Sequence, residues 1–342
     1  MDSTTPDIGT LENQLSEPTE AVLDTLRQYP GDIVFLGVGG KMGPSMARMA
    51  RRACEALGDD RRIIGVSRFS QPDLKKQLSD WGIEPTSCDL LDSAAVDRLP
   101  DAALVVFMTG MKFGGSLNAG RMWAMNTLAP AHACRRYAAS RFVVFSTGNV
   151  YPFTSPDTGG SKECDTPEPV GEYGMGALAR ERMFDYFSQK HDMPVSIVRL
   201  NYACDLRYGV LVDLAIKIWN GDPIDLSMGY FNTIWQADAN AQALSLWAHA
   251  SSPPFILNVT GSRTLSVQDV SETMAKIMNK PARFVGSPKT NSLLSNARHA
   301  GEMFGPSRVN EETLVQWTAH WVMNGGQHLG KETGFNNRSG RF

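Results

Sequence analysis

A buried apolar run that leads into a glycine-rich turn and then a helix sets the fold of this chain: Asp32-Ile33-Val34-Phe35-Leu36-Gly37-Val38-Gly39-Gly40-Lys41-Met42-Gly43, continued by Pro44 to Cys54. Four consecutive apolar residues have the length and composition of a buried parallel strand. Glycines let the backbone turn tightly and approach a pyrophosphate, and the helix presents unpaired N–H groups to its negative charge. The order therefore predicts a dinucleotide site with contacts from Gly37, Gly40, Lys41, Met42 and Gly43. A plain strand-to-helix connection is the alternative.

The overall composition is that of a globular protein that can bury a large core, with 342 residues of which 42% are hydrophobic and 20% charged. A net charge of −3 with scattered Lys and Arg predicts no nucleic-acid partner. No run approaches the roughly 18 apolar residues of a membrane span, and the acidic start is unlike a targeting peptide. The five cysteines and six histidines show no metal-ligand spacing. We therefore expect a cytoplasmic protein without a metal site or a membrane partner.

Strand-like runs alternate with helical runs through the first two thirds of the chain. Strands are expected at 33–36, 62–66, just before 88, 103–108, 142–145, 195–200 and 255–259. The helices predicted between them include 44–53, 121–137 and 173–189. This alternation predicts an α/β fold with a doubly wound, parallel, Rossmann-type sheet.

Changes of pattern along the chain predict its division into domains. Residues 1–30 are expected to form a polar segment, loosely held to about residue 17, and a short helix. The dinucleotide-binding domain spans 31–201, and 232–260 return to it. A smaller C-terminal α+β substrate region takes in 202–231 and 261–323. Residues 324–342 are rich in glycine and polar residues, and we expect a C-terminal arm without secondary structure.

Several motifs follow one another in a specific order: Asp89-Leu90 after the third strand, Ser146-Thr147-Gly148-Asn149-Val150-Tyr151 after the fifth, Glu172-Tyr173-Gly174 at the start of a helix, and Glu181 eight residues after the tyrosine. Over about residues 32 to 260 the chain resembles the extended short-chain dehydrogenase/reductase family, the NAD-dependent epimerase/dehydratase group. The resemblance implies that Tyr173 exchanges the proton of a substrate hydroxyl and that Thr147 hydrogen-bonds to the reacting oxygen. It also places Asp89 and Leu90 at the adenine.

The chain departs from this family at the lysine of the Y-x-x-x-K motif, because Ala177 stands four residues after Tyr173. In the family that lysine lies one helical turn from the tyrosine. Its charge favours the phenolate, and it binds the nicotinamide ribose. Three interpretations stay open. Tyr173 works with another cation, such as Arg180, Lys112 or Lys162; the chemistry needs no strongly acidic tyrosine; or the protein binds a dinucleotide without turnover.

Two further positions concern the choice and path of the cofactor. The second strand ends in Ser67-Arg68 rather than in an acidic residue. An acidic residue would accept the ribose hydroxyls of NAD, whereas arginine suits the 2′-phosphate of NADP. We therefore expect NADP or NAD, with a slight preference for NADP. Thr109-Gly110, after the fourth strand, falls where the ribose and nicotinamide pass in this fold, and a simple turn is the alternative.

The substrate side of the site is less clear from the sequence. Where the family commonly has R-x-x-N-x-Y-G-P, this chain has Arg199-Leu200-Asn201-Tyr202-Ala203, which is one residue short and lacks the Gly-Pro. The candidate substrate residues are Asn149, Asn201, Tyr202, Arg207 and Trp235. Arg207 is equally suited to an ordinary salt bridge, and Trp235 to the core.

The predicted function is that of an NAD(P)-dependent oxidoreductase or epimerase/dehydratase. It would act on a hydroxyl or keto carbon of a small-molecule substrate: a sugar, a sugar acid or a nucleotide sugar. The alternative is a dinucleotide-binding sensor or scaffold without turnover. Because family members are often dimers through two helices of each subunit, the resemblance implies a homodimer through the helices at 121–137 and 173–189.

Overall fold

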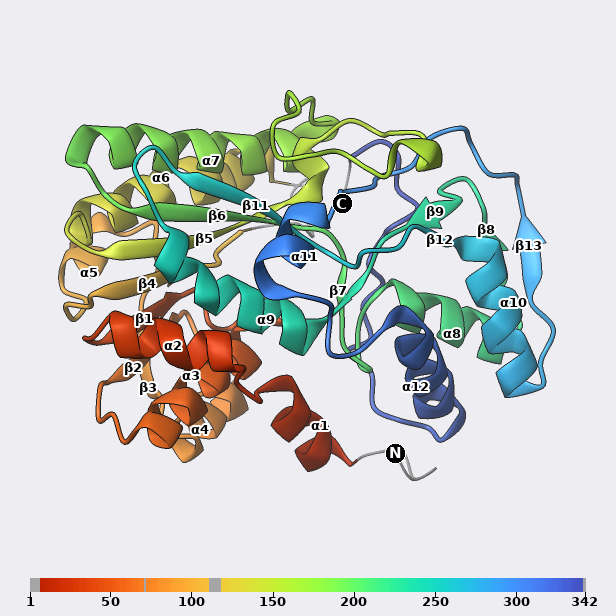
Figure 1. The fold of residues 1–342 in the computed structure, drawn as a ribbon, viewed down its shortest axis with the longest axis horizontal. Coiled ribbons are helices and arrows are strands. Elements are labelled where there is room, and N and C mark those ends of the chain that lie inside the picture. Colours follow the sequence, from red (N-terminus) through yellow and green to blue (C-terminus); the bar gives the residue numbers. More distant parts are fainter. Residues whose placement is uncertain (1–6, 71, 111–117, 341–342) are drawn as a thin grey trace.

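A seven-stranded, all-parallel sheet forms the centre of the molecule in the computed structural model, which describes residues 7–70, 72–110 and 118–340. Its strands are β1 (Ile33–Leu36), β2 (Ile63–Ser67), β3 (Glu84–Ser87), β4 (Leu104–Phe107), β5 (Arg141–Thr147), β6 (Val195–Leu200) and β11 (Phe255–Val259). They are arranged in the order β11-β6-β5-β4-β1-β2-β3 (Figure 1). The predicted doubly wound parallel sheet is therefore confirmed.

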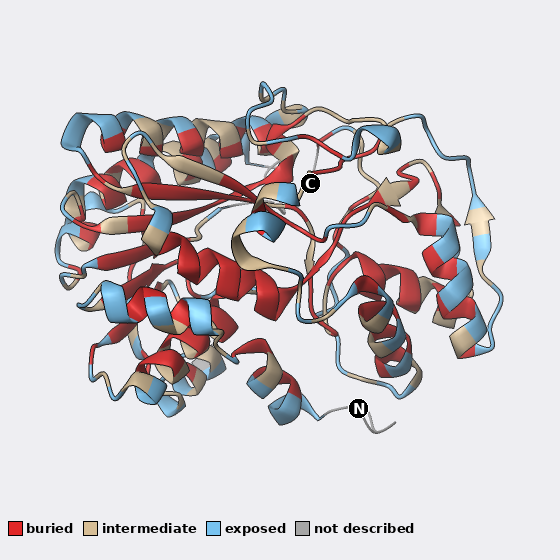
Figure 2. Ribbon diagram, in the orientation of Figure 1, coloured by how far each residue is buried: buried red, intermediate tan, exposed pale blue. Residues whose placement is uncertain are grey.

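Each face of the sheet is covered by helices because successive side chains of a strand point to opposite faces. Ile33 and Phe35 of β1 belong to one core, and Val34 and Leu36 belong to the other. The first face packs against α2 (Glu20–Gln28), α3 (Gly43–Leu57), α4 (Pro72–Asp80) and α9 (Gln236–Ser245). The second packs against α5 (Ser93–Asp97), α6 (Ala119–Arg136) and α7 (Gly171–His191). Figure 2 shows the strands as a buried layer between them.

The order of the strands creates a crevice at the carboxyl edge of the sheet. β1, β2 and β3 run outward in one direction, whereas β4, β5 and β6 run outward in the other. The connections therefore diverge between β1 and β4, and a crevice opens at the carboxyl ends of these strands. The glycine turn follows β1 at this edge, and the ends of β4 and β5 lie beside it.

A smaller region of helices and short strand pairs lies beyond this edge, at the right of Figure 1. Its helices are α8 (Val210–Asn220), α10 (Val267–Met278) and α12 (Glu311–Met323), whereas α11 (Arg298–Phe304) packs against β11 of the central sheet. Its strand pairs are β7 (Ala203–Cys204) with β10 (Ile234–Trp235), β8 (Pro223–Asp225) with β13 (Arg283–Val285), and β9 (Tyr230–Phe231) with β12 (Leu265–Ser266). None of the helices in the described ranges is both long and apolar enough to span a bilayer.

The two ends of the chain are held more firmly than the sequence predicted. Residues up to about 17 were expected to be loose, but α1 (Ile8–Leu15) forms there and buries Leu11 and Leu15 completely. The tail from 324 has no helix or strand, as expected, but it packs onto the protein. Phe335 is buried against the ring of Phe231, at a centroid distance of 6.3 Å. Both corrections have one cause: a few apolar side chains in a polar segment suffice to anchor it to the core.

Candidate active site

The glycine turn has the close backbone packing that a pyrophosphate cradle needs. Gly37 has φ +99°, and a Cβ there would lie 2.4 Å from Thr109 Oγ1. A Cβ on Gly43 would lie 2.1 Å from the carbonyl oxygen of Val38, so this glycine lets α3 start against the turn. The N-cap residue Met42 makes no side-chain hydrogen bond to the helix. No cap side chain therefore occupies the first amides of α3, to which Pro44 contributes none, and the turn suits an anion such as a pyrophosphate.

The predicted adenine end of the site lies at the ends of β2 and β3. Ser67 packs against the turn, because a Cβ on Gly39 would lie 2.5 Å from its hydroxyl. Arg68 is exposed. Asp89 forms a half-exposed ion pair with Arg121 at 3.7 Å, whereas the side chain of the neighbouring Leu90 belongs to the core. Arg68 and Asp89 are thus accessible to a ligand, while Leu90 can contribute its backbone.

Thr109 and Gly110 connect the end of β4 to this turn. The hydroxyl of Thr109 donates to the carbonyl of Leu36, at 3.1 Å, and so fixes the end of β4 beside the end of β1. Gly110 leaves room for a guanidinium, because a Cβ there would lie 3.0 Å from Nη1 of Arg180. Gly110 therefore lies against the Arg180 side chain, and its place beside the ribose and nicotinamide stays a prediction.

The predicted proton-exchanging residue, Tyr173, lies in the first turn of α7 and faces a cavity of about 350 Å³. The cavity extends to Gly40, Lys41 and Met42 of the glycine turn. Its wall also contains Ser146, Arg180, Tyr202, Tyr208 and Thr333. The phenol and the pyrophosphate cradle therefore open into the same space, at the carboxyl edge of the sheet.

Thr147 ends β5 next to this cavity, but the residue that lines the cavity is its neighbour Ser146. Thr147 is buried, and its hydroxyl oxygen accepts hydrogen bonds from the backbone and side-chain amides of Asn149, at 3.2 and 3.1 Å. The contact of Thr147 with a reacting oxygen stays a prediction.

The helix position where the family has lysine is closed in this chain. Ala177 is fully buried in a small apolar cluster with Val150 and Tyr151. Of the three alternative cations, Lys112 lies outside the described residues, and Lys162 is exposed in the loop before α7 and does not line the cavity. Arg180 lines the cavity together with Tyr173.

Below the cavity, a buried ionic network fixes β5, β6 and α7 to one another. Glu181 of α7 forms a two-pronged ion pair with Arg199 of β6, at 3.0 and 2.7 Å, and the two side chains are 1% and 2% exposed. The Ser146 hydroxyl donates to Glu181 at 2.5 Å. Arg199 also donates to the hydroxyl of Tyr151 at 2.8 Å. The resemblance flagged Glu181 by its spacing, and its partner on β6 is visible only in the fold.

The predicted substrate residues fall into two groups. Tyr202 lines the cavity, with φ +49°, whereas Asn149 and Asn201, which follow β5 and β6, do not line it. Arg207 instead pairs with Glu12 and Asp205, and Trp235 is buried against the ring of Trp317. Neither of these two residues lines the cavity. Local ion pairing and core packing account for both, and we assign them no substrate role.

Tyr208 and Thr333 are among the residues of the cavity wall that the sequence did not predict. Tyr208 precedes α8, and its ring centroid lies 2.9 Å from Nζ of Lys41. Thr333 comes from the C-terminal tail and bonds to Asp213 of α8 at 2.8 Å through its amide and 2.5 Å through its hydroxyl. No sequence motif marks either residue, because both reach the cavity through the packing of the smaller region.

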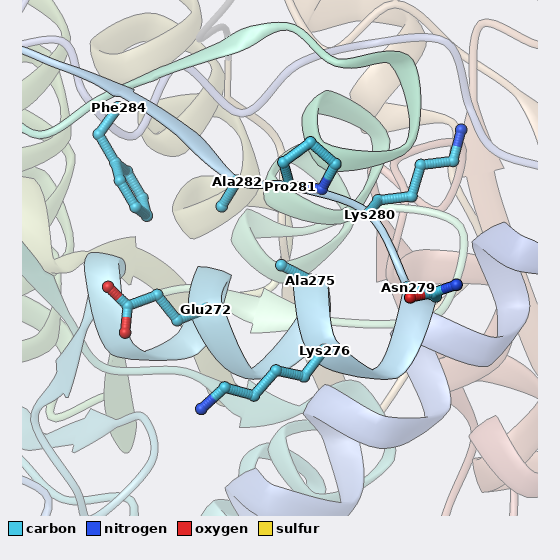
Figure 3. A pocket seen from close by; sticks show the side chains of 8 residues that line it. All are labelled: Glu272, Ala275, Lys276, Asn279, Lys280, Pro281, Ala282 and Phe284. Carbon is cyan, nitrogen blue, oxygen red and sulfur yellow. The ribbon is translucent and has the colours of Figure 1, made fainter.

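A second hollow lies on the outer side of the smaller region, between α10 and the segment that leads into β13. Figure 3 shows the side chains of Lys276 and Lys280 pointing away from each other there. Charges that diverge do not hold one anion between them. The hollow is far from the carboxyl edge of the sheet, and we assign it no role.

Fold and site together define a dinucleotide-binding α/β protein of the Rossmann type. The model of the NAD-dependent epimerase/dehydratase family matches residues 34–203, and the chain belongs to this family. A search of curated proteins finds no match.

Solved structures show the same fold over most of the chain. MoeE5 in complex with UDP-glucuronic acid and NAD is 20% identical, with 86% of this chain and 99% of that one covered and a TM-score of 0.69. UDP-glucuronic acid 4-epimerase from Bacillus cereus is 16% identical, the match covers 86% of this chain and 99% of that one, and the TM-score is 0.70. dTDP-glucose 4,6-dehydratase from Bacillus anthracis is 13% identical, the match covers 86% of this chain and 96% of that one, and the TM-score is 0.71.

Proposed function

We propose that this chain is an NAD(P)-dependent epimerase/dehydratase or oxidoreductase that acts on a hydroxyl or keto carbon of a sugar, sugar acid or nucleotide sugar. The observation that carries the proposal is the single cavity shared by Tyr173 and the glycine turn. It is supported by the family match and by the similar structures, two of which hold NAD with UDP-glucuronic acid.

In the proposed mechanism, the residues of the chain position the substrate and move its proton. Tyr173 accepts the proton of the reacting hydroxyl and returns it when the reaction runs backwards. Thr147 donates a hydrogen bond to the same oxygen, and Asn149 holds the Thr147 side chain in place. The turn at Gly37, Gly40 and Gly43 would hold the pyrophosphate. When bound, the nicotinamide supplies the acceptor or donor of the hydride that the reacting carbon exchanges.

The remaining predicted contacts complete the proposed site. Ser67 and Arg68 would contact the adenosine ribose, and Asp89 the adenine, with the backbone of Leu90 beside it. Asn149, Asn201 and Tyr202 would contact the substrate. Thr109 and Gly110 would border the nicotinamide ribose.

The proposal is tested with the purified full-length chain. NAD⁺ or NADP⁺ is added with UDP-glucose, UDP-glucuronic acid or dTDP-glucose, and turnover is followed by absorbance at 340 nm and by NMR of the sugar. We expect turnover that falls at least about 100-fold in Tyr173→Phe, the scale of a general acid–base contribution. Tyr29→Phe, at the end of α2, is the matched control and should leave turnover unchanged. Turnover that survives Tyr173→Phe would refute the proposed mechanism.

We also propose that NADP binds more tightly than NAD. Arg68 is exposed at the end of β2, where the chain has Ser67-Arg68 in place of the acidic residue that would repel a 2′-phosphate. Calorimetric titration of both cofactors with the wild-type protein and with Arg68→Ala measures this preference. The substitution should weaken NADP⁺ binding about tenfold, because it removes one charged contact, and should leave NAD⁺ binding nearly unchanged. Equal losses for both cofactors would refute a phosphate contact.

A non-catalytic sensor or scaffold is the second candidate, and Ala177 is the observation that favours it. Ala177 lies in a closed apolar cluster with Val150 and Tyr151, so the position of the family lysine itself carries no cation in this chain. Ala177→Lys distinguishes the two functions. If turnover appears only in this variant, the native protein is a binding protein; measurable wild-type turnover excludes that reading.

We further propose a cytoplasmic homodimer that associates through α6 and α7. These helices carry large exposed apolar side chains: Leu128 on α6 and Met175 and Tyr186 on α7. All five cysteines are unpaired, which suits a reducing compartment. Light scattering after size exclusion should give twice the chain mass for the wild type and the chain mass for Leu128→Asp with Tyr186→Asp. A monomeric wild type would refute the dimer.

A further inference from the structure

Arg180 is a buried cation for which the described residues supply no anionic partner. Its side chain is only 5% exposed, yet no carboxylate among the described residues lies within ion-pair distance. The nearest candidate in sequence, Glu181, is fully engaged by Arg199 and Ser146. A buried charge without a partner is costly, so such a residue persists where something else complements it.

The guanidinium is also incompletely hydrogen-bonded. Its Nη1 donates to the carbonyl oxygen of Thr109 at 2.6 Å. Its Nε is buried and has no hydrogen-bond partner in the described part of the chain. Because Nε has almost no accessible surface, a ligand in the cavity that Arg180 lines would reach the guanidinium through its other N–H groups.

The backbone around Arg180 is shaped to leave it in this position. Gly110 lies close to the guanidinium, because a Cβ there would lie 3.0 Å from Nη1. Tyr173 lies seven residues before Arg180 on α7, which is about two helical turns, so the two residues lie on the same face of the helix. Burial lowers the pKa of Arg180, and the interaction with Tyr173 acts in the opposite direction.

We propose that Arg180 is the cation of this active site and performs the two tasks of the lysine that is missing at position 177. Its charge stabilises the negative oxygen of Tyr173 after that residue has lost its proton. Its remaining N–H donors bind the nicotinamide-side ribose, whose expected path runs past Thr109 and Gly110. This assignment deepens the proposed function and rests on it for the identity of the ligand. In this chain the positive charge then comes from the residue two helical turns after Tyr173, whereas in the family it comes from the residue one turn after the tyrosine.

The competing cation is Lys41 of the glycine turn, which lines the same cavity. Its ammonium lies over the ring of Tyr208, on the side of the smaller region. Arg180 instead comes from the same helix as Tyr173 and is anchored to the end of β4. The two cations can be separated by experiment, since each can be replaced by glutamine without touching the other.

The test uses two measurements that need no substrate. The first is the alkaline titration of tyrosine absorbance at 295 nm, in which Tyr173 is identified as the step that Tyr173→Phe removes. The second is calorimetric titration with NAD⁺ and with NADP⁺. The variants are Arg180→Gln, Arg180→Lys and Lys41→Gln, with Arg298→Gln, an exposed arginine on α11, as the matched control.

We expect Arg180→Gln to move the Tyr173 step upward by about one pH unit or more, the usual effect of losing a nearby opposite charge. Affinity for both dinucleotides should fall about tenfold or more, the effect of losing a charge-assisted hydrogen bond. Arg180→Lys should keep the step near its wild-type position, because the charge is retained. Arg298→Gln should change neither measurement.

Two results would overturn the proposal. One is an unchanged step and unchanged affinity in folded Arg180→Gln; the other is a step that moves in Lys41→Gln and stays in place in Arg180→Gln. If Arg180→Gln does not fold, Arg180→Met replaces it, because methionine removes the charge and keeps an unbranched apolar side chain in the buried position. That variant should move the step in the same direction, and an unmoved step would count against Arg180. Since neither measurement involves turnover, failure here leaves the turnover test of the proposed function intact.

Discussion

Replacing Gly37 by alanine should reveal how tightly the glycine turn is built. The residue has φ +99°, a backbone conformation that costs an L-residue about 1 to 2 kcal/mol. Its new Cβ would also lie 2.4 Å from Thr109 Oγ1, and 3.0 and 3.1 Å from the Thr109 backbone. Overpacking of this kind typically costs about 1 to 3 kcal/mol. The two effects add to a loss of about 2 to 5 kcal/mol in the free energy of unfolding.

The matched control is Gly58→Ala at the end of α3. Gly58 also has positive φ, +65°, but nothing lies within 4 Å of a Cβ placed there. This variant should therefore lose only the backbone contribution, about 1 to 2 kcal/mol. Urea unfolding followed by tryptophan fluorescence measures both variants under the same conditions.

The cause of the larger loss can be located by a double-mutant cycle with Thr109→Ala. Removing Oγ1 takes away the shortest contact of the new methyl group, so the combined loss should be smaller than the sum by about 0.5 to 3 kcal/mol. Gly37→Ala should also weaken binding of NAD⁺ about tenfold or more, because the displaced turn no longer fits the pyrophosphate. If Gly37→Ala lowers the free energy of unfolding no more than Gly58→Ala does, the inference that Thr109 packs closely against the glycine turn is refuted.

Two further predictions concern buried carboxyl groups. Glu181→Gln leaves Arg199 buried without its partner charge, so the free energy of unfolding should fall by about 3 to 5 kcal/mol. The control is Glu84, which forms an exposed ion pair. Glu84→Gln should lower the free energy of unfolding by less than about 1 kcal/mol in the same urea unfolding experiment. A loss for Glu181→Gln no larger than that of the control would contradict the prediction. Burial raises the pKa of Asp213 above its usual 3.8, so the folded protein binds the carboxyl proton more tightly than the unfolded chain does. The stability that Asp213 contributes is therefore present below about pH 4 and is lost as the pH rises. Asp213→Asn should therefore gain stability relative to the wild type from pH 4 to pH 7, because its amide oxygen can still accept from Thr333; a difference that does not change with pH would contradict this sign.

Much of the fold follows from short-range patterns in the sequence. The apolar run at 33–36 predicts a buried strand because its four residues have no polar face, and the structure buries all four. Alternation of such strands with helices leaves a parallel sheet as the economical arrangement, since each crossover needs a helix. The extra helix α1 and the packed tail escaped this reasoning because single apolar residues such as Phe335 find their partners only in the folded protein.

For the site, the sequence by itself determined which backbone can turn against a pyrophosphate and which tyrosine begins α7, since glycine spacing and motif order are local properties. Only the tertiary structure decided which cations line the cavity with Tyr173, namely Arg180 and Lys41. Arg180 and Lys162 are both near Tyr173 in sequence. Arg180 is buried on α7 and lines the cavity with Tyr173, whereas Lys162 is exposed in a loop. The tertiary structure also brought Thr333 to the cavity and took Trp235 into the core. The physical reason is that a side chain's surroundings depend on the packing of segments far apart in the chain, which no local pattern encodes.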